Sequence, residues 1–162
     1  MIYSASFKMS TPSDREIQVT RVFDAPRALV FEAFTKPELV KRWLLGPPGW
    51  TMPICEIDLK VGGVYRYLWH NDSDGREMGL SGVFREIVSP KLLVATENPT
   101  WHASEALDTT TFVEEGSATR MTITVLYEST EVRDIALKSG MDRGMAMSYD
   151  RVEELLSSLL AA

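Results

Sequence analysis

The chain has almost none of the residues from which covalent cross-links and metal centres are built. It contains one cysteine, Cys55, and two histidines, His70 and His102. A single cysteine excludes an intrachain disulfide, and within its apolar run MPICEIDL it is expected to be a small buried hydrophobic residue. Neither histidine belongs to a His-Glu-x-x-His or similar motif, so the sequence predicts no metal site and no cofactor.

The chain also lacks an excess of positive charge and a long apolar run. Lys and Arg number 17 against 23 Asp and Glu, and the formal net charge of -6 argues against a nucleic-acid-binding protein. No run approaches the about 18 consecutive apolar residues of a membrane span. The N-terminus lacks the basic and apolar regions of a signal peptide, so we expect a cytoplasmic protein.

The most informative order of elements lies in residues 16–44. The segment EIQVTRVF (16–23) alternates and is rich in β-branched residues, which predicts a strand. Asp24 is expected to cap the helix that follows, with Pro26 near its first position, and Pro37 is expected to open a second short helix. One face of the predicted strand carries Ile17, Val19, Arg21 and Phe23.

Strand patterns separated by turns follow, and the chain ends in a long helical pattern. The further expected strands are 53–59, 64–70, 76–89, 90–97, 106–115 and 119–127. Residues 130–162 read as helix, with Thr130 as the N-cap and a break or bend at 139–140. The order predicts an α+β fold, in which a curved antiparallel sheet of about seven strands surrounds the C-terminal helix. We expect a disordered leader over residues 1–14 and a single domain over 15–162.

Several separated motifs together resemble a known family. They are VFDAPRALVFEAFTKPELVKRWL, EIDLKVGGVYRY, GVFREIVSPKLLVATE, TFVEEGSATRMTITV and SGMDRGMAMSYDRVEELLSSL. In this order they are similar to the bacterial branch of the family named for the activator of the 90-kDa heat-shock protein ATPase, within the START-like (SRPBCC) superfamily. The resemblance implies the helix-grip fold and a hydrophobic pocket between sheet and helix. Where family members often carry Gly-Trp in the last helix, this chain has Gly144-Met145.

The candidate ligand-binding residues are those expected to line this pocket or close its mouth. They are Trp43, Trp50, Arg66, His102, Met121, Ile123, Val125, Tyr127, Met141, Met145 and Tyr149. Methionines and aromatic side chains suit an adaptable apolar lining, and Arg66 and His102 would add polar groups. The alternative interpretation is that the apolar members simply fill a core.

Three functions are weighed. The leading hypothesis is binding of a small hydrophobic or amphipathic molecule in the pocket. The resemblance implies a second, a co-chaperone or protein-interaction module, and a third, an enzyme of the cyclase or hydrolase kind. For the enzyme, His102, Arg66 and Tyr149 are the candidate acid–base groups, although we assign no catalytic residue. A homodimer would form by pairing of an exposed edge strand, either 16–23 or 76–88.

Overall fold

The structure, a computed structural model that describes residues 6–162, is built on one eight-stranded antiparallel sheet. The strands are β1 (Lys8–Ser10), β2 (Glu16–Phe23), β3 (Trp50–Ile57), β4 (Val64–Asn71), β5 (Glu77–Val88), β6 (Leu92–Pro99), β7 (Ala106–Glu115) and β8 (Ala118–Leu126). Their spatial order is β1-β2-β8-β7-β6-β5-β4-β3. The predicted α+β helix-grip fold is confirmed.

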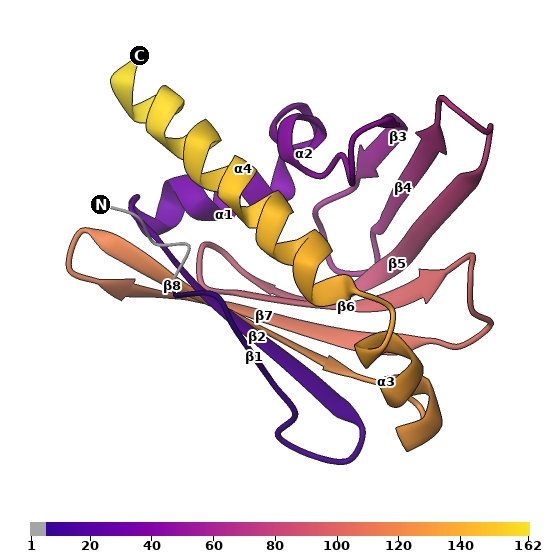
Figure 1. The fold of residues 1–162 in the computed structure, drawn as a ribbon. Coiled ribbons are helices and arrows are strands. Elements are labelled where there is room, and N and C mark those ends of the chain that lie inside the picture. The colour runs from indigo at the N-terminus through magenta and orange to yellow at the C-terminus, as the bar shows by residue number, and fades with distance from the viewer. Residues whose placement is uncertain (1–5) are drawn as a thin grey trace.

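Four helices accompany the sheet in the described part of the chain. They are α1 (Arg27–Thr35), α2 (Pro37–Trp43), α3 (Thr130–Leu137) and α4 (Met141–Ala161). Figure 1 shows α4 crossing the sheet on the same side as α1 and α2, while β3 and β4 curl up beside them. None of the helices within residues 6–162 combines the length and the apolar character needed to cross a membrane.

The strand β1 was not predicted. It pairs with β2 in antiparallel register, with Met9 opposite Val19, so Lys8–Ser10 extend the sheet by one strand. The expected disordered leader is therefore wrong for these three residues, and residues 1–5 lie outside the described part. A three-residue strand is too short to show alternation, which is why the sequence pattern did not reveal it.

The position of β1 also changes which strands lie at the edges. The sheet ends at β1 on one side and at β3 on the other, and both β2 and β5 have neighbours on either side. The expectation that 16–23 or 76–88 is a free edge is wrong. Pairing of two copies through either of those strands is therefore blocked by a strand already in place.

The corner after β2 differs from the predicted cap. The N-cap of α1 is Pro26, which has no side chain able to cap, and Asp24 instead donates its backbone N–H to the carboxylate of Glu153. Asp24 is thus not the helix cap. Pro37 does occupy the first turn of α2, as predicted. The backbone N–H groups of a first turn have no acceptor within the helix, so proline costs no hydrogen bond there.

The C-terminal helical region is divided as the sequence suggested. The N-cap of α3 is Ser129, whose hydroxyl accepts the N–H of Val132 at 3.2 Å, rather than Thr130. The break falls between Leu137 and Met141, where Gly140 has φ of 82° and lies in the left-handed region. Glycine adopts this conformation without the steric cost of a Cβ.

The core lies between the concave face of the sheet and the helices. The face of β2 that carries Ile17, Val19, Arg21 and Phe23 is the inward one, since all four residues are almost fully buried. Burial of each large apolar side chain contributes about 1.5–3 kcal/mol. Arg21 is the one charged side chain on this face of β2. Its burial does not stabilise the fold by itself, because a buried guanidinium needs negative charges beside it.

Candidate functional site

The long helix α4 has two unlike parts. Every buried residue of the helix lies from Ser148 onward, namely Ser148, Tyr149, Val152, Leu155 and Leu156. Residues 141–147 contribute none, and they are either partly or fully exposed. The helix therefore closes the core only from Ser148 onward.

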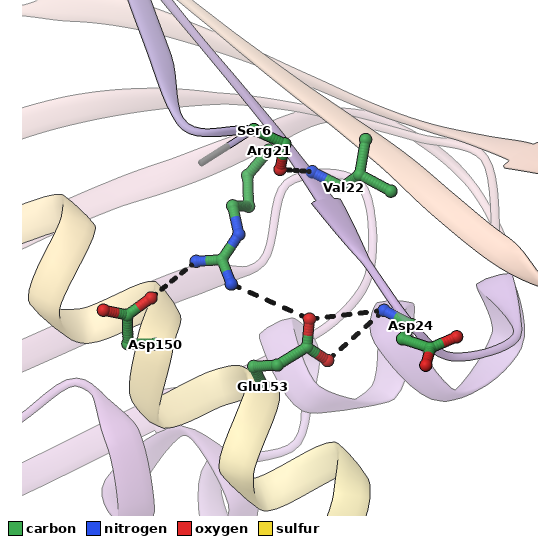
Figure 2. Close-up of polar contacts among 6 residues, drawn as sticks. All are labelled: Ser6, Arg21, Val22, Asp24, Asp150 and Glu153. Carbon is green, nitrogen blue, oxygen red and sulfur yellow. Dashed lines mark hydrogen bonds and ion pairs between the residues drawn. The ribbon is translucent and has the colours of Figure 1, made fainter. Parts of the chain in front are cut away.

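A buried arginine holds the middle of α4 against the sheet (Figure 2). The Arg21 side chain is 1% exposed, and its Nη1 lies 3.1 Å from Oδ1 of Asp150. Its Nη2 lies 3.7 Å from Oε1 of Glu153, which also accepts the N–H of Asp24. The guanidinium stacks over the ring of Phe23, 5.0 Å from its centroid. These contacts, the Arg21 clamp, fix α4 to β2.

The structure places five of the predicted site residues in the packed core. They are Trp43, Met121, Ile123, Val125 and Tyr149. The indole N–H of Trp43 donates to the carbonyl of Ala33 at 2.8 Å, and the Trp43 ring packs against Phe34 and Tyr149. For these side chains, apart from the hydroxyl of Tyr149, the alternative interpretation as core fits the structure better than a role at the mouth of a pocket.

Three predicted residues remain partly exposed at the other end of the interior. Tyr127, just after β8, and Met145 on α4 pack against the core cluster without being buried in it. Met141, at the start of α4, is likewise only partly exposed.

Two of the predicted residues lie elsewhere. Arg66 is on the opposite face of β4 from Tyr65 and Tyr67, and its exposed side chain pairs with Glu56 at 3.8 Å, so its expected place inside the sheet is wrong. Alternation along β4 puts adjacent residues on opposite faces, and Arg66 takes the solvent side. Trp50 begins the edge strand β3 and packs against the Arg76 guanidinium, 5.4 Å from its ring centroid.

The remaining candidate, His102, lines a hollow in the loop between β6 and β7. This open hollow of about 370 Å³ is lined by Asn98, Pro99, His102, Ala103, Ser104 and Glu105. The Nδ1 of His102 lies 2.9 Å from the Ser104 hydroxyl. None of the other predicted site residues lines this hollow, which follows directly on the end of β6.

Two acidic residues that the sequence analysis did not select lie on the concave face. In the pairing of β6 with β7, Ala95 is opposite Asp108 and Glu97 is opposite Ala106. Since Ala95 and Ala106 both belong to the core, Glu97 and Asp108 share that inward face as diagonal neighbours. Their carboxyl groups are hydrogen-bonded to each other. We call them the carboxyl pair.

The surroundings of the carboxyl pair favour a shared proton. Burial raises the pKa of Glu97 well above its ordinary value, and the neighbouring charge of Asp108 raises it further. Burial also raises the pKa of Asp108, opposed by hydrogen bonds from Glu97 and Thr110, whose hydroxyl donates to Oδ1 at 2.7 Å. Two carboxyls this close cannot both ionise without cost, so Glu97 keeps a proton where an ordinary glutamate has lost it.

Comparison with known protein families shows to which family the chain belongs. The family model described as Activator of Hsp90 ATPase homolog 1-like protein matches residues 24–157. The chain belongs to this family. The resemblance drawn from the motifs is thereby confirmed, although no curated protein matches the chain.

Solved structures of Activator of Hsp90 ATPase homolog 1-like and related bacterial proteins share the fold. A protein from Rhodobacter sphaeroides has 26% identity and a TM-score of 0.89, covering 94% of this chain and 98% of its own. A protein from Nitrosomonas europaea has 25% identity and a TM-score of 0.80, with 94% and 100% covered. The AHSA1-like protein from Aeromonas hydrophila, at 16% identity and a TM-score of 0.69 over 85% and 93%, shares the fold alone.

In this member of the Activator of Hsp90 ATPase homolog 1-like family, the Glu97→Gln variant tests the carboxyl pair. The unfolded chain releases the Glu97 proton near pH 4.5, whereas the native state retains it to higher pH. The wild type therefore loses stability as pH rises from 4.5 towards the raised pKa. Glutamine cannot ionise, so the variant should gain stability over the wild type as pH rises, with no such gain at pH 4.

Urea unfolding at pH 4, 6 and 8 measures this effect. A matched control is Glu105→Gln, because Glu105 lines the loop hollow and its charge has no carboxyl partner there. The Glu105 variant should follow the wild type at all three pH values. A Glu97→Gln variant whose stability difference from wild type does not change with pH would show that Glu97 ionises normally.

Proposed function

We propose that the protein binds a small amphipathic molecule between the first two turns of α4 and the concave face of the sheet. One observation carries this proposal: residues 141–147 of α4 bury nothing of their own, and the face of the sheet that α4 crosses carries the inward-facing carboxyl pair (Figure 1). A ligand with an apolar body and a polar end suits such surroundings, because binding sites combine apolar walls with a few placed polar groups.

The side chains at this end of the interior support both parts of such a ligand. Met141 and Met145 offer flexible, polarizable apolar surface. Glu97 and Asp108 supply hydrogen-bonding groups from the inward face of β6 and β7. Tyr127 has both a ring and a hydroxyl to contribute.

The enzyme hypothesis receives less support from the placement of its candidates. Arg66 is on the outer face, His102 is in the loop hollow, and the ring of Tyr149 is in the core. Acid–base catalysis requires such groups within hydrogen-bonding reach of one reacting molecule. The interaction with a chaperone, which the name of the family suggests, is the second candidate. Co-purification with a heat-shock ATPase would support it.

The ligand site is tested with a neutral lipophilic fluorophore, N-phenyl-1-naphthylamine. We expect saturable binding to the wild type and about tenfold weaker binding to Met145→Gln, since placing an amide in an apolar wall costs about 1.4 kcal/mol or more. The matched control is Met147→Gln on the same helix, where the side chain is 44% exposed. That variant should bind within about twofold of wild type.

Two results would contradict the proposed site. The first is a wild type that shows no saturable fluorescence. The second is a loss of affinity in Met147→Gln as large as that in Met145→Gln, which would place the fluorophore on the outside of α4. Circular dichroism of both variants establishes that each remains folded.

A further inference from the structure

One continuous stretch of the chain, which includes the whole of α3, buries no residue. Every residue of 126–147 is partly or fully exposed, and no longer stretch without a buried residue occurs within residues 6–162. It contains α3 and the first two turns of α4. Segments with few buried contacts open locally at a lower cost in free energy than the core does. We call residues 130–147 the strap.

Both ends of the strap are joined to well-packed structure. Shortly before it, the backbone N–H of Tyr127 donates to the carbonyl of Arg15 at 2.8 Å, which continues the pairing of β8 with β2. Directly after it, Ser148 is buried, and the Arg21 clamp holds Asp150. Between these two attachments, the strap is held down only by contacts of its own.

Hydrogen bonds hold the strap to the rest of the molecule through a single side chain. Arg133 on α3 is 13% exposed, and its Nη1 donates to the backbone carbonyls of Ser13 at 2.7 Å and Glu16 at 3.4 Å. Both carbonyls belong to the turn between β1 and β2, near which α3 lies (Figure 1). Among residues 6–162, no other member of the strap hydrogen-bonds to a strand or to this turn.

The apolar contact of the strap with the core is equally limited. In the described part of the chain, Met145 is the one residue of the strap that packs against the core cluster, and it remains partly exposed. Ile135 on α3 is 57% exposed. Because protein interiors are close-packed, a ligand that enters beneath the first two turns of α4 takes the place of the Met145 side chain. Its binding therefore requires the strap to move.

We propose that the strap opens and closes over the ligand site, and that Arg133 is the latch that holds it closed. The gating of a ligand rests on the proposed function, whereas the opening is a property of the free protein. When the strap opens, Arg133 leaves the two carbonyls, Met145 leaves the core and the ligand enters. The latch then forms again over the bound ligand. It therefore slows entry and release alike.

Native-state hydrogen exchange of the free protein, measured residue by residue, tests the opening. In the wild type, the amides of residues 133–138 and 145–147 should exchange through one common opening. Their protection should be at least about a hundredfold lower than that of Val152 and Leu156, which are fully buried on the same helix.

Two matched arginine variants test the latch in the same experiment. Arg133→Met removes the donors and keeps the apolar stem, and it should raise exchange throughout the strap by about tenfold while leaving Val152 unchanged. Arg143→Met makes the same change at an exposed arginine of the strap that has no hydrogen bond within residues 6–162. It should exchange as the wild type does.

Stopped-flow fluorescence with N-phenyl-1-naphthylamine tests the gating. The latch stabilises the closed state with and without ligand, so Arg133→Met should raise the association and dissociation rate constants together, each at least about fivefold. The Kd should stay within about threefold of wild type, which an arginine that only shaped the ligand site would not predict. If Arg133→Met does not fold, Arg133→Lys replaces it, because lysine keeps the charge without the forked donors, and both rates should rise at least about threefold.

The outcomes separate this inference from the function on which it rests. Strap amides as protected as Val152, or exchange in Arg133→Met equal to wild type, overturn the latch even where the fluorophore binds. Faster exchange with unchanged rates of fluorophore binding shows a strap that opens without gating, and overturns the gating alone. Absence of fluorophore binding by the wild type overturns the proposed function and the gating, while hydrogen exchange still decides whether Arg133 holds the strap closed.

Discussion

Replacing both Asp150 and Glu153 by their amides is expected to lower the free energy of unfolding by about 3–5 kcal/mol. The double variant D150N/E153Q leaves the Arg21 guanidinium, whose side chain is 1% exposed, without a negative partner. Glu153 is the more important partner, because it lies at 22% exposure and also accepts the N–H of Asp24. Asp150 is 54% exposed, so Asp150→Asn alone should cost at most about 1 kcal/mol.

Urea unfolding of the two single variants, the double variant and a rescue variant measures this effect. The rescue is Arg21→Met in the D150N/E153Q background, which removes the buried charge and keeps most of the side-chain volume. We expect it to recover at least half of the lost stability, as a buried ion pair replaced by apolar groups is often close to neutral. A double variant whose free energy of unfolding lies within about 1 kcal/mol of wild type would show that the buried Arg21 charge does not depend on these two carboxylates.

Replacing Gly82 by alanine is expected to cost about 3 kcal/mol. A Cβ at this position of β5 would collide with the carbonyl oxygen of Thr96 and lie 2.7 Å from Cε1 of Tyr65. Tyr65, the residue opposite Gly82 on β4, extends over the glycine to donate its hydroxyl to that same carbonyl. The neighbours are backbone and a fixed ring, so neither can move aside without breaking this contact.

Gly144→Ala is the matched control, and its effect should have the opposite sign. A Cβ at Gly144 meets no atom within 4 Å, and the residue lies inside α4. Alanine in a helix interior is more stable than glycine by about 0.5–1 kcal/mol. Thermal unfolding should therefore show a lower Tm for Gly82→Ala and a slightly higher Tm for Gly144→Ala. Similar losses of stability in both variants would mean that the cost at Gly82 does not come from the collision of the new Cβ with its neighbours.

The order of elements was predictable because local signals are dense in this chain. The Pro37 helix start, the break before Met141 and the alternation of 16–23 all rest on residues close together in sequence. The alternation also put Arg21 on the same face as Ile17, Val19 and Phe23, which the structure shows to be buried. Its partners could not be predicted, since Asp150 and Glu153 are about 130 residues away and their approach depends on how α4 lies across the sheet.

The candidate site was less predictable for the same reason. Tyr149 and Met145 fall on one helical stripe, yet one is buried and the other partly exposed, because α4 packs closely only from Ser148 onward. Glu97 and Asp108 meet through the register of β6 with β7, which alternation within either strand does not define. A weak signal existed, since Glu97 shares the parity of Ala95 and Leu93 in an otherwise apolar face.

Methyl spectra of the eight methionines test the location of the ligand most directly. With ¹³C-methyl-labelled protein titrated with N-phenyl-1-naphthylamine, the signals of Met141 and Met145 should shift in a saturable manner. The signal of Met147, on the exposed side of the same helix, should stay in place, as should that of Met78 on β5. Saturable shifts at Met147 in place of Met145, or no methionine shift at a concentration that saturates the fluorescence, would contradict a site beneath the first turns of α4.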